Sequence, residues 1–240
     1  GPDPAGRTLR SGRADVIGVL MTQHNSYAFS DPYAIGFLRG VAEELAASQT
    51  GILLLPPTAT AVQRASIDAV TSLCLQSTAP AIEAALARGI PVVSSVTDPR
   101  PDIDHVAIDD VAAGVQLGGH LARLGHRDVA VLLDDDTHTA GAATGPGFVD
   151  NVDRLRGLRR ALGDASVRVF TRPENSYNEG RAAVSPIWDA RDRPTAIVAF
   201  SDTMALGVMD GLRERGAVAG ADVSLAGFDD IPEAPGRGLT

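Results

Sequence analysis

Short apolar runs alternate along the chain with longer segments that carry apolar residues at helical spacing. The run at 15–21, DVIGVLM, is rich in β-branched residues and predicts a buried strand. After it, Ile35, Leu38, Ala42 and Leu45 recur on one face of a predicted helix. Further strands are predicted at GILLL (51–55), SLCL (72–75), IPVVSSV (90–96), HVAI (105–108), DVAVLLD (128–134), VRVF (167–170), TAIVAF (195–200) and DVSLAGF (222–228).

Predicted helices separate these strands. A short one is indicated by Val62, Ala65 and Ala69, and Pro186 should end or kink a later one. The others are expected at 79–89, 109–125, 152–163, 178–190 and 201–216. Continuous apolar strands between helices are typical of parallel sheets that are covered on both faces. The sequence therefore predicts an α/β fold.

The two halves of the chain resemble each other. RADVIGVL at 13–20 and HRDVAVLL at 126–133 begin them alike. We therefore expect two doubly wound parallel-sheet subdomains, an N-terminal one at 14–104 and a C-terminal one at 105–240. Ligands of such sheets bind at the carboxyl ends of the strands. The two adjacent acids Asp229 and Asp230 follow the last predicted strand, where a ligand would lie.

Composition narrows the class of protein. The 240 residues include 44% hydrophobic residues, enough for a large core, and the net charge is −9. An acidic surface repels phosphate backbones, which argues against nucleic-acid binding by the chain as a whole. No apolar run approaches the ~20 residues of a membrane span, and the first residues do not resemble a secretory signal. Cys74 is the only cysteine, so a cytoplasmic setting fits best.

Motifs for catalysis and cofactor binding are missing from the sequence. It contains no G-x-G-x-x-G after the first strand, no phosphate-binding G-x-x-x-x-G-K-[ST] and no G-x-S-x-G. The five histidines lack metal-ligand spacing, and Cys74 is interpreted as a core thiol in a strand. The cluster DDDTH at 134–138 could hold a divalent cation, although a solvated loop is the favoured interpretation. We expect no enzyme activity, no cofactor and no metal.

Three segments carry a resemblance to a known family. They are PTAIVAFSDTMALGVMDGLRERGAVAGADVSLAGFDDIPEA (194–234), VAIDDVAAGVQLGGHLARLGHRDVAVL (106–132) and AGRTLRSGRADVIGVL (5–20). Together they resemble the effector-binding core of lac-repressor-type (LacI/GalR) transcriptional regulators. The resemblance implies a type I periplasmic-binding-protein-like fold. It also implies that residues 1–13 are the remnant of a DNA-proximal hinge. The chain then looks like a truncated core without the helix-turn-helix headpiece.

The resemblance also implies effector-binding residues in the C-terminal subdomain. Asp229 matches the family's effector-contacting acid, and a strand-end cap is the alternative. Arg154 matches the family's cleft arginine, and a solvated Arg is the alternative. Ser201 stands where the family often has Asn. It could instead cap a helix, with Asp202 as the acid of the first turn. Asp109 matches the acid at the crossover between the subdomains.

In the N-terminal subdomain, Tyr27, Phe29 and Asp31 follow the first strand, where family members line the cleft. The two aromatics could equally anchor their loop onto the next helix. The resemblance implies a homodimeric repressor whose effector is sugar-like or purine-like. It would bind operator DNA only through a headpiece absent from this chain, and no membrane. The alternative function is a periplasmic sugar-binding protein of an ABC transporter. A small-molecule enzyme on the same fold is a third.

Overall fold

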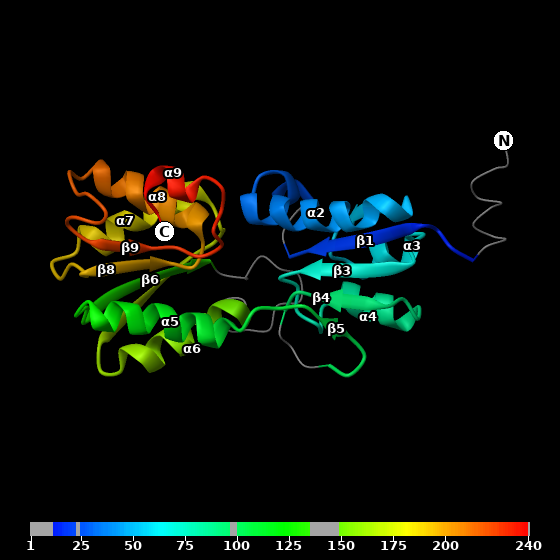
Figure 1. The fold of residues 1–240 in the computed structure, drawn as a ribbon, viewed down its shortest axis with the longest axis horizontal. Coiled ribbons are helices and arrows are strands. Elements are labelled where there is room, and N and C mark those ends of the chain that lie inside the picture. Colours follow the sequence, from blue (N-terminus) through cyan, green and yellow to red (C-terminus); the bar gives the residue numbers. More distant parts are fainter. Residues whose placement is uncertain (1–11, 23–24, 97–99, 135–148, 240) are drawn as a thin grey trace. The chain divides into compact units, whose positions relative to one another are not determined.

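The structure is a computed structural model that describes residues 12–22, 25–96, 100–134 and 149–239 (Figure 1). The described residues form two compact units. The first unit comprises 12–30 and Ala34–Ile108, and the second comprises Asp31–Tyr33 and 109–239. Most of the expected hinge remnant and most of the DDDTH cluster lie outside the described residues. No described helix is long and apolar enough to cross a membrane.

The first unit is built on a parallel five-stranded sheet. Its strand order is β2-β1-β3-β4-β5. Leu20 and Val70 lie in the core beneath α3 and α4, whereas Val19 and Met21 pack on the other face with α2. The elements are β1 (Val16–Met21), η1 (Asn25–Phe29), α2 (Pro32–Leu45), η2 (Ala46–Ser48), β2 (Gly51–Leu55), α3 (Ala59–Arg64), β3 (Ala69–Leu73), α4 (Pro80–Ala87), β4 (Val92–Ser94) and β5 (Asp104–His105).

The second unit is built on a parallel four-stranded sheet with the order β7-β6-β8-β9. Figure 1 shows α5 and α6 on one face of this sheet and α7 and α8 on the other. The expected α/β class with two parallel sheets is thereby confirmed. The elements are α5 (Asp110–Arg123), β6 (Asp128–Asp134), α6 (Val149–Leu162), β7 (Ser166–Arg172), α7 (Tyr177–Trp188), β8 (Ala196–Ala199), α8 (Asp202–Arg213), β9 (Ser224–Ala226) and α9 (Ala234–Arg237).

Glycines bring the helices of each pair into backbone contact. A Cβ atom on Gly157 of α6 would lie 2.1 Å from the carbonyl oxygen of Val111 of α5, and one on Gly114 would lie 2.1 Å from that of Arg154. Gly180 and Gly207 have the same role between α7 and α8. A side chain of any size would push these helices apart, so each pair sits as one layer on the sheet.

The structure corrects several expected boundaries. The strand at His105, which we placed in the second half, pairs with β4 in the first sheet. The last strand ends at Ala226, two residues before Phe228, because the chain turns there. The helix that contains Pro186 continues to Trp188. Pro186 therefore lies in its last turn, where it neither ends the helix nor stops it from covering the sheet.

Further expectations about the first unit are wrong in detail. The helix near Val62 ends at Arg64, and Ala69 already belongs to β3. Cys74 is not inside a strand: it follows β3 with a φ of 53° and is half-buried. Ile35, predicted on the buried face of α2, is 45% exposed.

Candidate functional site

A network around Arg154 occupies the carboxyl end of the second sheet. The Nε atom of Arg154 donates to Oδ1 of Asp110 at 2.7 Å, and Nη1 donates to the carbonyl oxygen of Phe200 at 3.0 Å. The guanidinium carbon lies 4.6 Å from the centre of the Phe228 ring, within cation–π range. The Phe200 ring meets Phe228 edge-on at 5.6 Å between centres. Three segments therefore fix the guanidinium, and the alternative of a solvated Arg154 is wrong.

Asp229 lies in the turn that follows β9, beside this network. Burial raises the pKa of Asp229 to about 7. Arg154 opposes the rise, while Asp202 and Asp31 add to it. Near neutral pH the carboxyl group thus exists in both its neutral and its ionised form, so that it can donate as well as accept hydrogen bonds. Asp229 and Asp230 both have positive φ, 104° and 54°. Such backbone conformations cost energy in non-glycine residues and cluster at functional sites.

Asp202 positions the turn that carries Asp229. The residue is 4% exposed, and its Oδ2 accepts from the backbone N–H of Ile231 at 3.1 Å. A Cβ atom on Gly227 would lie 2.0 Å from Asp202 Oδ1, so the turn passes directly over the carboxylate. The backbone N–H of Asp202 also donates to the carbonyl oxygen of Phe228 at 2.7 Å. Asp202 therefore holds the turn in place, and a contact with ligand stays a prediction.

Ser201 and Asp109 both begin helices. The Ser201 hydroxyl accepts from the backbone N–H of Met204 at 3.1 Å as the N-cap of α8, and it donates to Oδ1 of Asn175. Asp109 accepts from the backbone N–H of Ala112 at 2.8 Å as the N-cap of α5. The capping alternative for Ser201 is confirmed. The N-cap role likewise accounts for an acid at position 109, and contact of Asp109 with an effector stays a prediction.

The predicted residues near the start of the chain have different environments. Tyr27 lies in η1 and packs beneath α2, which supports the anchor alternative for this side chain. Phe29, at the end of η1, is 72% exposed. Asp31 is buried and belongs to the second unit. There its Oδ2 accepts from Nδ2 of Asn175 at 3.4 Å. The structure therefore brings Asp31 together with the polar group around Ser201.

Sequence reasoning missed four members of the site: Asp110, Asn175, Phe200 and Phe228. Asp110 stands next to Asp109 in the sequence, and the paired acids were the available signal for it. Nothing in the local sequence marks Asn175, which lies just before α7. The described residues contain no group of three or more His, Cys, Asp or Glu that could hold a metal ion.

Comparisons with known proteins place this chain in a family. Residues 119–239 match the model of the periplasmic binding protein-like domain. The chain is similar to the HTH-type transcriptional regulator Rv3575c of Mycobacterium tuberculosis, with 32% identity over all of this chain and 73% of that protein.

Two solved structures extend the likeness. A LacI-family transcriptional regulator of Corynebacterium glutamicum matches 98% of this chain and 76% of its own, with a TM-score of 0.83 and 26% identity. The complex of the transcriptional regulator CelR with cellobiose matches 97% of this chain and 76% of its own, with a TM-score of 0.75 and 25% identity. These findings favour a regulator over a transporter-binding protein. The chain therefore belongs to the LacI-type family of HTH-type transcriptional regulators and carries their periplasmic binding protein-like domain.

Proposed function

We propose that this chain senses a small hydroxylated effector, of the sugar class, through Arg154 and Asp229. The observation that carries the proposal is the fixed guanidinium of Arg154 beside a carboxyl group whose pKa is about 7. Perturbed carboxyl groups next to a positioned cation are typical of functional sites. The structure in which CelR is complexed with cellobiose supports a carbohydrate effector.

The chemistry of the two side chains suits a polyol. The Nη2 atom of Arg154 has no hydrogen-bond partner among the described residues, and we propose that its N–H groups donate to hydroxyl oxygens of the effector. Asp229 can accept from hydroxyl groups when ionised and donate when neutral. Sugar hydroxyls both donate and accept, so one ligand can satisfy both side chains. The Arg154 guanidinium lies over one face of the Phe228 ring. A sugar ring would have to displace it to stack on that face.

We further propose how binding controls transcription. The effector would bind one arrangement of the two subdomains more tightly and shift their equilibrium, as linkage requires. A DNA-binding headpiece outside this chain would respond, and the regulator would act as a homodimeric repressor in the cytoplasm. Asp202 and Ser201 would serve this process by fixing the turn and the helix beside the ligand. Asp109 would fix the start of the helix that carries Asp110.

A thermal-shift screen tests the proposal. Cellobiose, ribose, other mono- and disaccharides and a set of purines would each be added to the 240-residue chain. A ligand present at a hundredfold its Kd stabilises the folded state by ~2.7 kcal/mol. We expect at least one hydroxylated compound to raise the melting temperature in a saturable way. If only compounds without hydroxyl groups raise it, the proposed effector class is wrong.

A further inference from the structure

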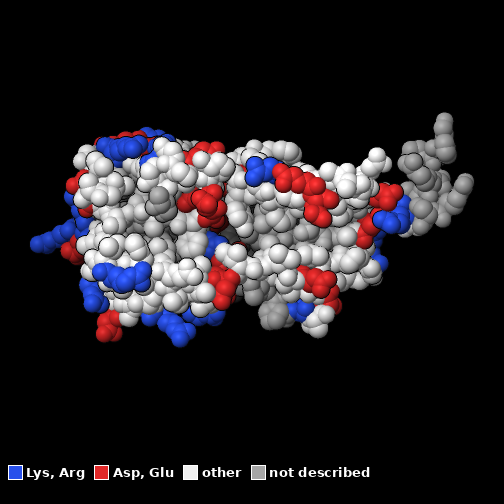
Figure 2. All heavy atoms as spheres, viewed as in Figure 1, with Lys and Arg blue, Asp and Glu red and all other residues white. Residues whose placement is uncertain are grey.

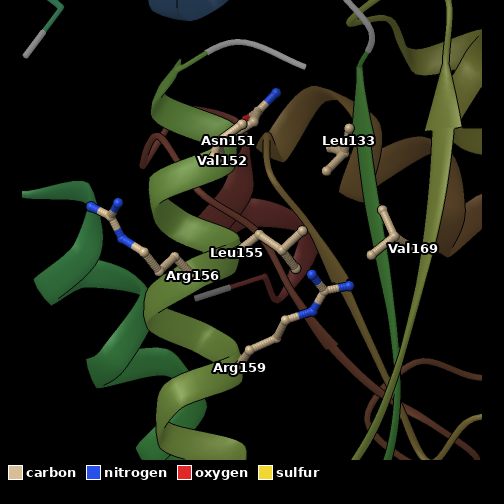
Figure 3. Close-up of a pocket in the computed structure, with 7 residues that line it drawn as sticks. All are labelled: Leu133, Asn151, Val152, Leu155, Arg156, Arg159 and Val169. Carbon is tan, nitrogen blue, oxygen red and sulfur yellow. The ribbon is translucent and has the colours of Figure 1, made fainter. Parts of the chain in front are cut away.

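A pocket of about 340 Å³ lies in the second unit between α6 and the strands β6 and β7. Figure 3 shows its lining: Leu155 points from α6 toward the strands, while Leu133 of β6 and Val169 of β7 face the helix. Val152 and Asn151 complete its upper end, near the start of α6. We call it the α6–β7 pocket. It is separate from Arg154 and Asp229, neither of which lines it.

The helix packing explains why this pocket exists. Gly114 and Gly157 allow α6 to approach α5 at backbone distance. Among the described strands, β7 lies at the edge of its sheet, so none of them flanks the helix on that side. The apolar side chains over β7 therefore stay partly uncovered: Val152 is 43% exposed, and Leu155 and Val169 are only partly buried. The result is an apolar hollow with room for an added group.

Two arginines of α6, Arg156 and Arg159, are among the residues that line this hollow. Figure 3 shows the Arg159 side chain running from α6 toward the strands, alongside Leu155. Within the described part of the chain, the Arg159 side chain has no ion pair or hydrogen bond, unlike the Arg156 side chain. Arg156 also lines the pocket, but Figure 3 shows its guanidinium directed away from the strands, and it is already paired with Asp153 at 3.0 Å. At the upper end, Nδ2 of Asn151 donates to Oδ1 of Asp134 at 2.9 Å, which fixes the amide.

The charge around the pocket favours an anion. The chain as a whole carries a net charge of −9, yet Figure 2 shows Arg side chains gathered along the surface of α5 and α6. Arg159 and Arg160 are both exposed there, in the last turn of α6. A guanidinium binds a carboxylate through two parallel hydrogen bonds, and the hydrocarbon wall beside it would hold an apolar body. The volume falls at the lower end of the roughly 300–1,000 Å³ of small-molecule sites.

We propose that the α6–β7 pocket is a second ligand site, which takes a small carboxylate with a compact apolar or aromatic body. The carboxylate pairs with Arg159, and the apolar body lies against Leu155, Val169 and Leu133. A longer extended peptide could instead pair with the free edge of β7. The small molecule is favoured because the apolar wall is short and carries one unpaired cation at its end.

Calorimetric titration of the 240-residue chain with phenylacetate tests this site. We expect saturable binding, and at least tenfold weaker binding of phenylacetamide, which has the same shape without the charge. Arg159→Gln should weaken phenylacetate binding at least tenfold. Arg160→Gln removes the neighbouring charge of the same helix turn, outside the pocket lining, and should change the affinity less than twofold. Val152→Trp, at a partly exposed position, should fill the pocket and abolish binding without unfolding the protein.

Three results would overturn the proposal. The first is a calorimetric titration in which phenylacetate shows no saturable binding up to millimolar concentration. The second is equal loss of affinity in the Arg159 and Arg160 variants, which would mean that phenylacetate responds only to the positive surface. The third is binding of an extended acidic peptide, in place of phenylacetate, that Val152→Trp leaves unchanged. That result would identify the edge of β7 as a peptide site.

Discussion

Replacing Asp229 by Asn should stabilise the protein at alkaline pH and leave it unchanged at acidic pH. The folded protein holds the pKa of this carboxyl at about 7, against an ordinary 3.8, because burial disfavours the charge. Without any relief by solvent, this difference in pKa would lower the free energy of unfolding at alkaline pH by roughly 4 kcal/mol. Asp229 is only half-buried, so solvent relieves part of the cost, and we expect about 1–2 kcal/mol.

The direction follows from proton linkage. A raised pKa means that the folded state holds the proton more tightly, so stability is lost as pH rises from about 4 to about 7. Asn cannot ionise, so Asp229→Asn removes this loss. Urea unfolding at pH 4 and pH 8 would measure it, with the exposed neighbour Asp230→Asn as the control. If Asp229→Asn destabilises the protein equally at both pH values, Asp229 is a structural cap and the reasoning is refuted.

Three further predictions concern the scaffold. Gly157→Ala should destabilise the protein by about 1–3 kcal/mol or more, because its Cβ would lie 2.1 Å from the carbonyl oxygen of Val111. Gly119→Ala, in α5, should instead stabilise the protein by up to ~1 kcal/mol, because its Cβ would come no closer than 3.6 Å to the Arg123 side chain. Urea unfolding compares the two variants, and an equal change in the free energy of unfolding would contradict the close contact between α5 and α6. Ser201→Ala should cost about 0.5–2 kcal/mol through loss of the α8 cap, and an unchanged melting temperature would remove that role.

Local patterns in the sequence predicted most of the fold. The apolar runs indicated β6 and β8 because those strands are buried on both faces. Their central positions are therefore all apolar, and each strand is recognisable as a continuous apolar run. The short β5 was assigned to the wrong half because a two-residue edge strand has no periodicity, and its partner β4 is recognisable only in the folded sheet. Cys74 was misplaced because its φ of 53° ends β3 without a glycine.

The site was predictable only in part. Asp229 and Arg154 were found because the resemblance marks their positions. The partners that orient Arg154 come from α5, from the end of β8 and from the turn after β9, so no spacing along the chain reveals them. The turn at Phe228 and Asp229 was expected as the end of a strand. Its actual form depends on Asp202, whose buried carboxylate binds a backbone N–H 29 residues away.

The most direct test of the proposed effector site is a calorimetric titration of the carbohydrate found in the thermal-shift screen into three proteins. These are the unaltered chain, Asp229→Asn and Asp230→Asn. We expect Asp229→Asn to weaken binding by about 1.5–3 kcal/mol, the range for a hydrogen bond to a charged group, which is roughly 10- to 150-fold in Kd. Asp230→Asn, altered at the adjacent exposed carboxylate, should bind as the unaltered chain does. Equal affinity of all three proteins would contradict the assignment of Asp229 as the residue that holds the effector.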